Sequence, residues 1–427
     1  DSPYSYDAGG INLNEVKENK RQARKNNIDY DTYEKVSHFK TGISWNIKVN
    51  PNTDLDSYFF YQNRDFNSKL PFNDGGIIYL DRDYYGLGFK YSNEKSLVNR
   101  IRSFTAGFDY TYQRDNRTRF NNNYGIKEDM NFDQIEKFKS TGIYFLNQTS
   151  YDSGIIFRYG LRYDDNKIGT NKEPYVSLTS TNPSLGISYV NNNSSFFFSA
   201  GSSFETPTLN ELSNNPNGPG FNKNLNPSSS ISYELGWRKS LSNMSFEAVI
   251  YSIKTDNEIL QYGLEEFPGK SFYQNIGATS RIGLELSSSL LFSSGKLLIS
   301  YTNSKNTFQD LTNYDQSLNG LRLPGIPGQI LDLELSINFN ESSSLLISNK
   351  FISEIFADNL NKDSIDSYNI INLSYSKRIF KNSEVFIGVN NLANEDYFDN
   401  IRINAFGKRY YEPAPDRNYY LGINLAF

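Results

Sequence analysis

The sequence predicts an all-β protein, an antiparallel transmembrane β-barrel, and three observations lead to this fold class. Residues 417–427 alternate strictly, with apolar or aromatic side chains at Tyr419, Leu421, Ile423, Leu425 and Phe427. The same alternation recurs in segments along most of the chain. Short and long connections alternate between these segments. A side-chain period of two places the apolar set against lipid and the small or polar set toward the lumen.

In chain order we expect about 17 strands, each defined by alternation and bounded by turn residues. Their approximate spans are 36–49, 54–65, 76–92, 102–114, 132–147, 153–165, 179–190, 194–204, 230–240, 244–256, 271–291, 296–305, 328–339, 343–356, 367–380, 384–391 and 417–427. In a soluble sandwich the apolar face of each strand would form the core, whereas in a barrel it forms the outer wall. The side chains expected to point outward include Ile231, Trp237, Leu331, Leu333, Leu421, Ile423 and Leu425. Those expected to point inward include Glu234, Asp332 and Glu334.

The connections favour a barrel over a sandwich. Short turns rich in Asn, Ser and Pro occur at 50–53, 191–193, 241–243, 340–342 and 381–383. Long polar segments occur at 114–131, 165–178, 205–229, 257–270, 306–327 and 392–416. Transmembrane barrels have short periplasmic turns and long extracellular loops. Long structureless loops are uncommon in compact soluble domains.

The order of the loops indicates how the chain enters the wall. A long loop precedes the last strand, so that strand descends, and counting back makes the first strand descend as well. Residues 1–35 are therefore expected to be an extracellular loop-like segment, and residues 36–427 a partial barrel. Single-chain bacterial barrels have an even number of strands that start from the periplasm. We therefore expect the first strands of the barrel to lie upstream of this chain.

Composition excludes several classes of protein. The chain has 427 residues, and it has no run of about 18 apolar residues that could form a membrane-spanning helix. It has no Cys and a single His, His38, so we expect no disulfide framework, metal site or cofactor. The net charge of −5 gives no argument for nucleic-acid binding. The 32 Tyr and 31 Phe fit both ordinary β-sheet preference and aromatic girdles at membrane interfaces.

Several segments together resemble one known family. They are SSFETPTLNELSNNPNGPGFNKNLNPSSSISYELGWR at 202–238, VNNLANEDY at 389–397 and RINAFGKRYYEPAPDRNYYLGINLAF at 402–427. This ordered set resembles the barrel of TonB-dependent outer-membrane receptors of the iron-complex type. The resemblance implies a barrel of about 22 strands around an N-terminal plug. It also implies a monomer in the bacterial outer membrane, a TonB complex as partner through the plug, and a ferric siderophore or similar scarce nutrient as ligand.

Two clusters of residues are candidate ligand contacts. The first lies in the loop 392–416 and comprises Arg402, Asn404, Arg409, Tyr410 and Tyr411. Arginine forks bind carboxylates and other anionic groups through two hydrogen bonds, and Tyr rings supply flat contact area. The second lies just past a strand end and comprises Glu205, Thr206, Asn210 and Glu211. The alternative for both clusters is structural: the first would pair with acids such as Glu412 and Asp416, and the second would shape the loop's exit from the barrel.

Three other functions compete with ligand uptake. A passive diffusion channel fits a lumen with charges of both signs, but it predicts a complete barrel with an even strand number. An outer-membrane enzyme requires a nucleophile, a base and an orienting residue, and with His38 as the sole histidine no such set is evident. We therefore expect no enzymatic activity. A soluble adhesin would lack the alternation of short and long loops.

Overall fold

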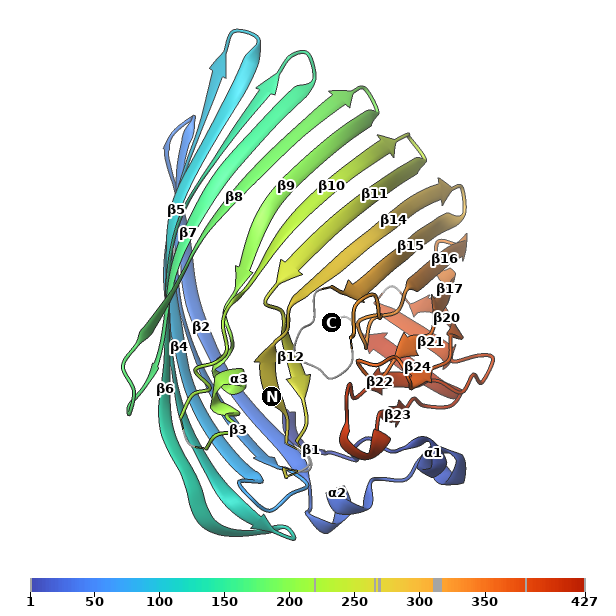
Figure 1. Cartoon of the computed structure of the whole chain (residues 1–427). Helices are drawn as coiled ribbons and strands as arrows, with labels where there is room; N and C mark the ends of the chain where they lie inside the picture. Colours follow the sequence, from blue (N-terminus) through green and yellow to red (C-terminus); the bar gives the residue numbers. More distant parts are fainter. Residues whose placement is uncertain are drawn as a thin grey trace.

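The computed structural model describes residues 2–218, 220–264, 266–267, 270–309, 317–380 and 382–425, and these form one curved antiparallel wall with loops and short helices at one end (Figure 1). An 18-stranded sheet makes up the wall. Its strands are β1 (Ser2–Tyr6), β2 (Tyr33–Asn50), β3 (Thr53–Lys69), β4 (Ile77–Leu97), β5 (Arg100–Asn123), β6 (Ile126–Tyr151), β7 (Ile155–Thr170), β8 (Val176–Asn191), β9 (Ser194–Glu205), β10 (Ser228–Ser240), β11 (Met244–Asp256), β14 (Ala278–Phe292), β15 (Gly295–Phe308), β16 (Gln329–Asn340), β17 (Ser343–Ile352), β20 (Tyr368–Phe380), β21 (Ser383–Asn390) and β24 (Asn418–Leu425).

Short elements occupy the loops at one end of the wall. They are β12 (Ile259–Tyr262), β13 (Phe272–Asn275), β18 (Ile355–Phe356), β19 (Ser364–Ile365), β22 (Phe398–Ile401), β23 (Tyr411–Pro413), α1 (Leu13–Asn19), α2 (Lys25–Asp29), α3 (Leu209–Ser213) and the 3₁₀ turn η1 (Phe406–Lys408). Figure 1 shows the tight hairpins at the top of the wall and these elements at the bottom. The short turns and four of the six predicted long connections therefore lie at opposite ends of the wall, whereas β5–β6 and β7–β8 are joined by short connections at the long-loop end.

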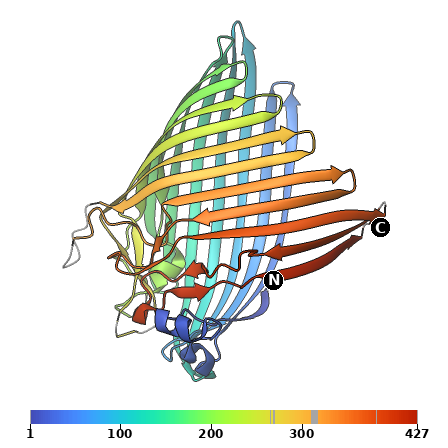
Figure 2. The same ribbon diagram turned by 90° about the vertical axis from the view of Figure 1, so that its right-hand side faces the viewer.

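The predicted strand order is confirmed. Each of the 17 expected strands corresponds to one wall strand from β2 to β24, and each wall strand pairs antiparallel with the next. Among the described residues, β24 has no partner on its free side, and β1 covers only the start of β2, where Ser2 pairs with Val36 and Tyr6 with Tyr33. The wall is therefore open between β24 and β2 (Figures 1 and 2).

Two predicted loops are instead strand. The segment 114–131 is occupied by β5 and β6, which run on to a tight turn where Tyr124 and Gly125 have φ of 47° and 90°. The segment 165–178 shrinks to 171–175 because β7 and β8 extend into it. Both extensions carry polar residues on both faces, so period-two alternation does not mark them. Three predicted segments include residues outside the described ranges, namely 310–316 in the loop 306–327, 381 in the turn 381–383, and 426–427 in the last strand.

The apolar faces of the strands are exposed, as a barrel wall requires. Leu421, Ile423 and Leu425 are 71%, 63% and 58% exposed and Ile231 is 52% exposed. Trp237, Leu331 and Leu333 are half-buried, and so are Glu234 and Asp332, while Glu334 is exposed. None of the seven apolar side chains is buried, which contradicts the core of a soluble sandwich. Buried apolar clusters lie at the long-loop end instead, for example Ile276, Phe308, Leu318 and Leu323.

The first 35 residues are more structured than a loop-like segment. Besides β1, they contain α1 and α2. The helix α1 begins at a capping box in which Asn12 Oδ1 accepts a hydrogen bond from the Glu15 amide and Glu15 Oε2 accepts one from the Asn12 amide. Within the described ranges, none of the helices is long and apolar enough to span a membrane.

Candidate ligand-binding site

The last long loop, which follows β21, packs into an apolar cluster that it shares with the segment after β17. Its strands β22 and β23 pair through Ile401 and Tyr411. Tyr410 and Tyr411 are 7% and 5% exposed, and the Tyr411 ring packs against Phe398 at 5.0 Å. They join a cluster that contains Ile352, Ile355, Ala357 and Ile365. Burial, followed by the charges of Asp358 and Asp363, raises the pKa of Tyr410 to about 12. Both tyrosines thus hold the loop together, and their rings are not available as an open contact surface.

The N-terminal segment docks onto this loop. Ile11 and Tyr411 exchange two backbone hydrogen bonds of 3.0 and 3.1 Å. A side chain at Gly10 would collide with the Arg409 carbonyl, so the close approach of the two backbones requires glycine there. Lys20 forms ion pairs with Asp396 and Asp416. These contacts bring residues nearly 400 positions apart to one side of the barrel mouth.

Two of the predicted arginines face acids of the docked segment. Arg402 Nη2 donates to Asp7 Oδ1 at 2.9 Å, and Arg402 Nε donates to Glu412. Arg409 Nη2 donates to Glu15 Oε1 at 3.1 Å, whereas its buried Nε has no hydrogen-bond partner among the described residues. The pairing of Arg402 with Glu412 is the structural alternative that the sequence left open. The unpaired Nε of Arg409 leaves a donor for another group.

A third guanidinium, that of Arg24, completes the cluster. Arg24 is half-buried, and no hydrogen bond of its side chain with another described residue is present. Burial and the charges of Arg409 and Arg402 lower the pKa of Arg24 below its ordinary value. A guanidinium stays protonated in proteins. Burying Arg24 beside two other arginines therefore costs free energy, and a bound anion would offset part of that cost.

The three arginines line one cavity of about 520 Å³. Lys270 contributes a fourth cation, and the carboxylates are those of Asp7 and Glu412. Asn404 also lines it: its backbone has a φ of 55°, and its Oδ1 accepts from the Asn359 amide at 3.0 Å. Aromatic and apolar lining residues include Leu70, Tyr262, Phe267, Ile403 and Phe406. Lys270 is paired with Asp74 at 2.6 Å, as Arg402 and Arg409 are with their acids, so Arg24 is the cation of this cavity without an ion pair among the described residues. The cavity therefore combines one uncompensated guanidinium with apolar walls, which suits a bulky anion.

The second predicted set surrounds α3, at the exit from β9. Thr208 and Glu211 form a capping box, because Thr208 Oγ1 accepts from the Glu211 amide at 3.2 Å and Glu211 Oε2 accepts from the Thr208 amide at 2.7 Å. Glu211 thus caps the helix. Glu205 is exposed at the end of β9. Glu211 therefore has a local structural role, and Glu205 faces solvent.

The other two residues of this set line a separate cavity. Thr206 and Asn210 face a space of about 520 Å³ that Arg64, Arg82 and Arg117 also line. Asn210 Oδ1 accepts from Arg117 Nη1 at 3.4 Å. The first and second predicted sets therefore border different cavities.

Buried charge anchors α3 to the wall. Arg117 and Glu136 pair at 3.0 Å while only 4% and 0% exposed, and Ser213 donates to Glu136. Arg82 donates to Asp115, which is fully buried, through bonds of 2.8 and 2.6 Å. The apolar side of the loop packs in a cluster of Ile168, Leu209, Leu212, Phe221 and Leu225. The loop after β9 is thus folded inward over the wall, near β3 and β4 in Figure 1.

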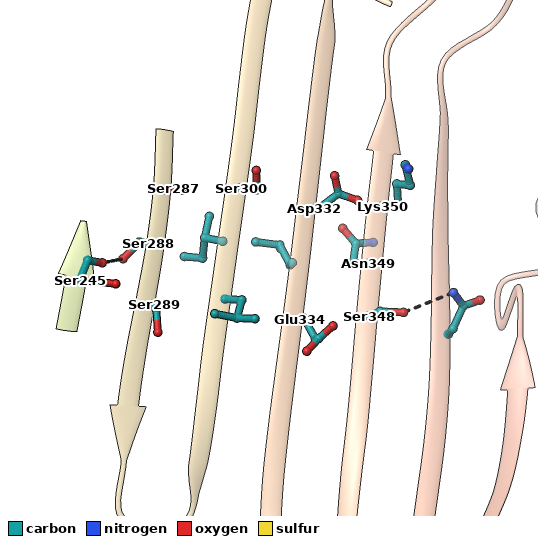
Figure 3. A pocket seen from close by; sticks show the side chains of 14 residues that line it. Ser245, Ser287, Ser288, Ser289, Ser300, Asp332, Glu334, Ser348, Asn349 and Lys350 are labelled. Atoms are coloured by element: carbon teal, nitrogen blue, oxygen red, sulfur yellow. Dashed lines mark hydrogen bonds between the residues drawn. The ribbon is translucent and has the colours of Figure 1, made fainter. Parts of the chain in front are cut away.

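The wall between β11 and β20 offers a polar surface rather than an enclosed site. Figure 3 shows Asp332, Glu334 and Lys350 projecting from β16 and β17 beside Ser300 and Ser348. Ser348 Oγ accepts from Asn372 Nδ2 at 3.3 Å. Hydroxyl and mixed-sign charged groups on adjacent strands make this a hydrated lumen wall.

Comparison with known proteins decides the family. A family model described as "TonB dependent receptor-like, beta-barrel" matches residues 1–392. The chain belongs to the TonB-dependent receptors. Members of this family are transport receptors of the outer membrane, and the receptor resembles them in fold as the sequence motifs implied.

Solved structures show the same architecture at low identity. The ferric citrate transporter FecA in its unliganded form has a TM-score of 0.79 and 15% identity, over 98% of this receptor and 65% of FecA. The siderophore receptor PiuA from Acinetobacter baumannii has a TM-score of 0.76 and 15% identity, over 92% of this receptor and 65% of PiuA. The copper transporter OprC has a TM-score of 0.68 and 15% identity, over 93% of this chain and 65% of OprC. The receptor chain thus spans less than two thirds of the length of these proteins.

Sequence reasoning missed the residues that the N-terminal segment brings to the site. Arg24, Asp7 and Glu15 lie in a part of the receptor that showed no strand alternation. Their contacts join positions that are separated by almost the whole chain, as in the pair of Glu15 with Arg409. The capping-box spacing from Asn12 to Glu15 was the one local signal that this segment is folded.

Proposed function

We propose that this receptor binds a ferric siderophore, or a similar large anionic chelate, at the arginine-lined cavity and imports it across the outer membrane in a TonB-dependent manner. The observation that carries the proposal is the cluster of Arg24, Arg402 and Arg409 around one cavity, with Arg24 and the Nε of Arg409 lacking partners. The fold similarity to a siderophore receptor and a ferric citrate transporter supports it.

Recognition would fall to the organic shell of the chelate. The metal is cargo and arrives already coordinated, so the receptor needs groups that match carboxylate, catecholate or hydroxamate oxygens. Guanidinium forks match such groups with two parallel charge-assisted hydrogen bonds. The apolar lining beside them would cover the rest of a bulky ligand.

TonB coupling belongs to the plug that the family resemblance implies. The arginine cavity lies at the long-loop end of the wall, which is the extracellular end in transmembrane barrels. Ligand captured there would stand at the entrance of the lumen, and energy-dependent plug movement would release it inward. The segment 205–211 would shape the rim of the barrel beside this path, with Thr206 and Asn210 facing the second cavity.

The test uses the full-length receptor and two defined probes, ferric citrate and a ferric catecholate labelled with radioactive iron. Arg24→Gln, alone and combined with Arg402→Gln and Arg409→Gln, should weaken binding of the preferred probe. A lost charge-assisted hydrogen bond costs about 1.5–3 kcal/mol, or about one to two decades in affinity. The single variant is the sharpest, because Arg24 makes no ion pair whose loss could undock the N-terminal segment.

The matched control removes three cations that lie off the cavity, through Lys17→Gln, Lys35→Gln and Lys362→Gln. All three side chains are exposed, and none of them forms an ion pair with another described residue. This variant should bind as the parent protein does. Equal binding by the cavity variant and the control would overturn the assignment of the site. Uptake that persists in cells without TonB would instead favour a passive channel.

A further inference from the structure

One arginine near the distal end of β5 lies under the loop after β9 without an acid as partner. Arg119 follows Arg117 by two residues, so both side chains lie on the same face of the strand, and both contact this loop. Arg119 Nη2 donates to Asn214 Oδ1 at 3.0 Å. Its buried Nε has no hydrogen-bond partner among the described residues, and Arg119 forms no ion pair with any of them. A guanidinium keeps its charge, and buried charges are normally paired, so a partner is missing.

The two acids whose charges act on Arg119 are already paired. Glu136 accepts hydrogen bonds of 3.0 and 3.2 Å from Arg117, and these two side chains are only 0% and 4% exposed. Asp74 pairs with Lys270 at 2.6 Å, and its side chain is 64% exposed. Neither carboxylate is therefore free to neutralise Arg119.

Arg119 lines a small cavity with aromatic walls. The cavity has a volume of about 190 Å³ and lies where the loop after β9 meets β5, β6 and the β12–β13 loop. The Arg119 guanidinium lies over the Phe132 ring at 5.2 Å. Phe267 and Phe272 also line the cavity, and their rings pack edge to face with centroids 5.5 Å apart. Pockets that enclose a whole drug-sized ligand measure about 300–1,000 Å³, so this one suits a small anion with an apolar part.

The neighbouring arginines show which kind of anion this edge of a guanidinium binds. Arg117 uses Nε for one oxygen of Glu136 and Nη2 for the other, and Arg82 binds a buried carboxylate through the same two atoms. At Arg119 the amide oxygen of Asn214 takes one hydrogen of Nη2. The second hydrogen of Nη2 and the N–H of Nε match the two oxygens of a carboxylate, whereas a halide offers a single acceptor atom.

The small cavity adjoins the arginine cavity. Phe267, Lys270 and Ser271 line both of them, so these residues form the partition between Arg24 and Arg119. A carboxylate therefore has two sources: a free small molecule, or one arm of a chelate held at Arg24.

We propose that the cavity at Arg119 is a binding site for a carboxylate group, which pairs with the guanidinium and fixes the loop after β9 to the wall. The loop is involved because Asn214, which contacts the same guanidinium, belongs to it. The site itself follows from the buried cation and its cavity, and only the second source, an arm of a chelate, rests on the proposed function.

The test follows hydrogen exchange of residues 209–214 in the full-length receptor, in neutral detergent at an ionic strength held constant with sodium chloride. Sodium benzoate serves as the free carboxylate and benzamide as its neutral counterpart. Benzoate at ten times its dissociation constant, taken from the same titration, should raise the protection factor of this segment about tenfold, because only the folded loop presents the site. Benzamide should leave the protection factor unchanged, and Arg119→Gln should abolish the effect of benzoate.

Two further variants keep the result interpretable. Arg114→Gln removes a cation from the opposite face of the same strand and should keep the full effect of benzoate. Arg119→Lys keeps the buried charge but loses the fork, so it should weaken benzoate binding about ten- to hundredfold even if Arg119→Gln fails to hold the loop. An equal effect of benzoate on the parent and both Arg119 variants, or an equal effect of benzamide or sodium chloride, would overturn the proposal.

Ferric citrate, used as a defined chelate, separates the two sources. Protection of residues 209–214 by ferric citrate that is lost in both Arg24→Gln and Arg119→Gln would support an arm of a chelate as the carboxylate. Protection by benzoate but not by ferric citrate would support a free carboxylate. If no chelate binds and the benzoate effect remains, the uptake proposal fails while this one stands, so the two failures give different results.

Discussion

Replacing Leu286 by Arg should destabilise the barrel far more than replacing the adjacent Ser287 by Arg. Leu286 lies on the outward face of β14, four residues from both Ile282 and Leu290 of the same apolar face, and across from Ala248 and Tyr301. It is therefore near the middle of the lipid-facing band. Ser287 points to the lumen wall shown in Figure 3.

The expected magnitudes follow from these positions. Arg on the lipid face at the bilayer midplane costs about 2–4 kcal/mol, or about 30- to 900-fold in the folding equilibrium. Arg at position 287 meets hydrated surface and has Glu247 directly across, so its effect should stay within about 0.5 kcal/mol.

The assay is a urea titration of the full-length receptor in phosphatidylcholine vesicles, with the folded fraction read from heat-modifiable electrophoretic mobility. Leu286→Ala separates the loss of the leucine side chain from the cost of the added charge. Equal destabilisation by the two arginines, or a larger effect at position 287, would refute the assigned faces of the wall. Because the side-chain period is two, such a result would reverse the assignment of every residue on β14.

Two further predictions concern the loops. Docking of α1 on the last loop should depend on pH: hydrogen bonds from Lys20 and Arg21 lower the pKa of Asp416, and bonds to Asp396 and Asp416 raise the pKa of Lys20. The contact should be complete between about pH 4 and pH 10, and it should weaken as pH falls through the lowered pKa or rises through the raised one. The protection factor of residues 13–19, which corrects hydrogen exchange for its intrinsic pH dependence, should therefore fall below about pH 4. A protection factor that stays constant from about pH 7 down to about pH 2 would contradict this. Glu136→Leu should release α3, because it leaves the buried Arg117 without its carboxylate at a cost of about 3–5 kcal/mol. Faster hydrogen exchange across residues 206–227, with no change in the control Glu205→Gln, would bear this out, and protection equal to the parent protein's would count against it.

Strand prediction succeeded where one face of the wall meets an apolar phase. From β7 to β11 the alternation is clear, because lipid selects apolar side chains at every second position. It failed at the distal ends of β5 and β6, where both faces are polar and the ladder continues beyond the apolar band. Segments 271–291 and 343–356 were each expected as one strand, but they divide into β13 and β14 and into β17 and β18. The alternation of apolar and polar side chains does not show where a strand leaves the sheet.

The site was only partly accessible from the sequence. The density of Arg and Tyr in the last loop pointed to a chemically active segment, and Arg402, Asn404 and Arg409 do border the cavity that Arg24 also lines. The role of Tyr410 and Tyr411 differs from that expectation, because their rings are buried in the loop's apolar cluster. Composition shows which residue types are present, but burial depends on what folds over them.

By itself the sequence determined the fold class, the strand order and the family, because each of these depends on periodicity or on short ordered motifs. Only the tertiary structure decided that the first 35 residues dock on the last loop and that Arg24 joins Arg402 and Arg409 around one cavity. It also decided that the guanidinium of Arg119 lies under the loop after β9 without an acid as partner among the described residues. The physical reason is that charge clusters depend on cross-strand register and on long-range docking, and neither can be read from the pattern of neighbouring residues.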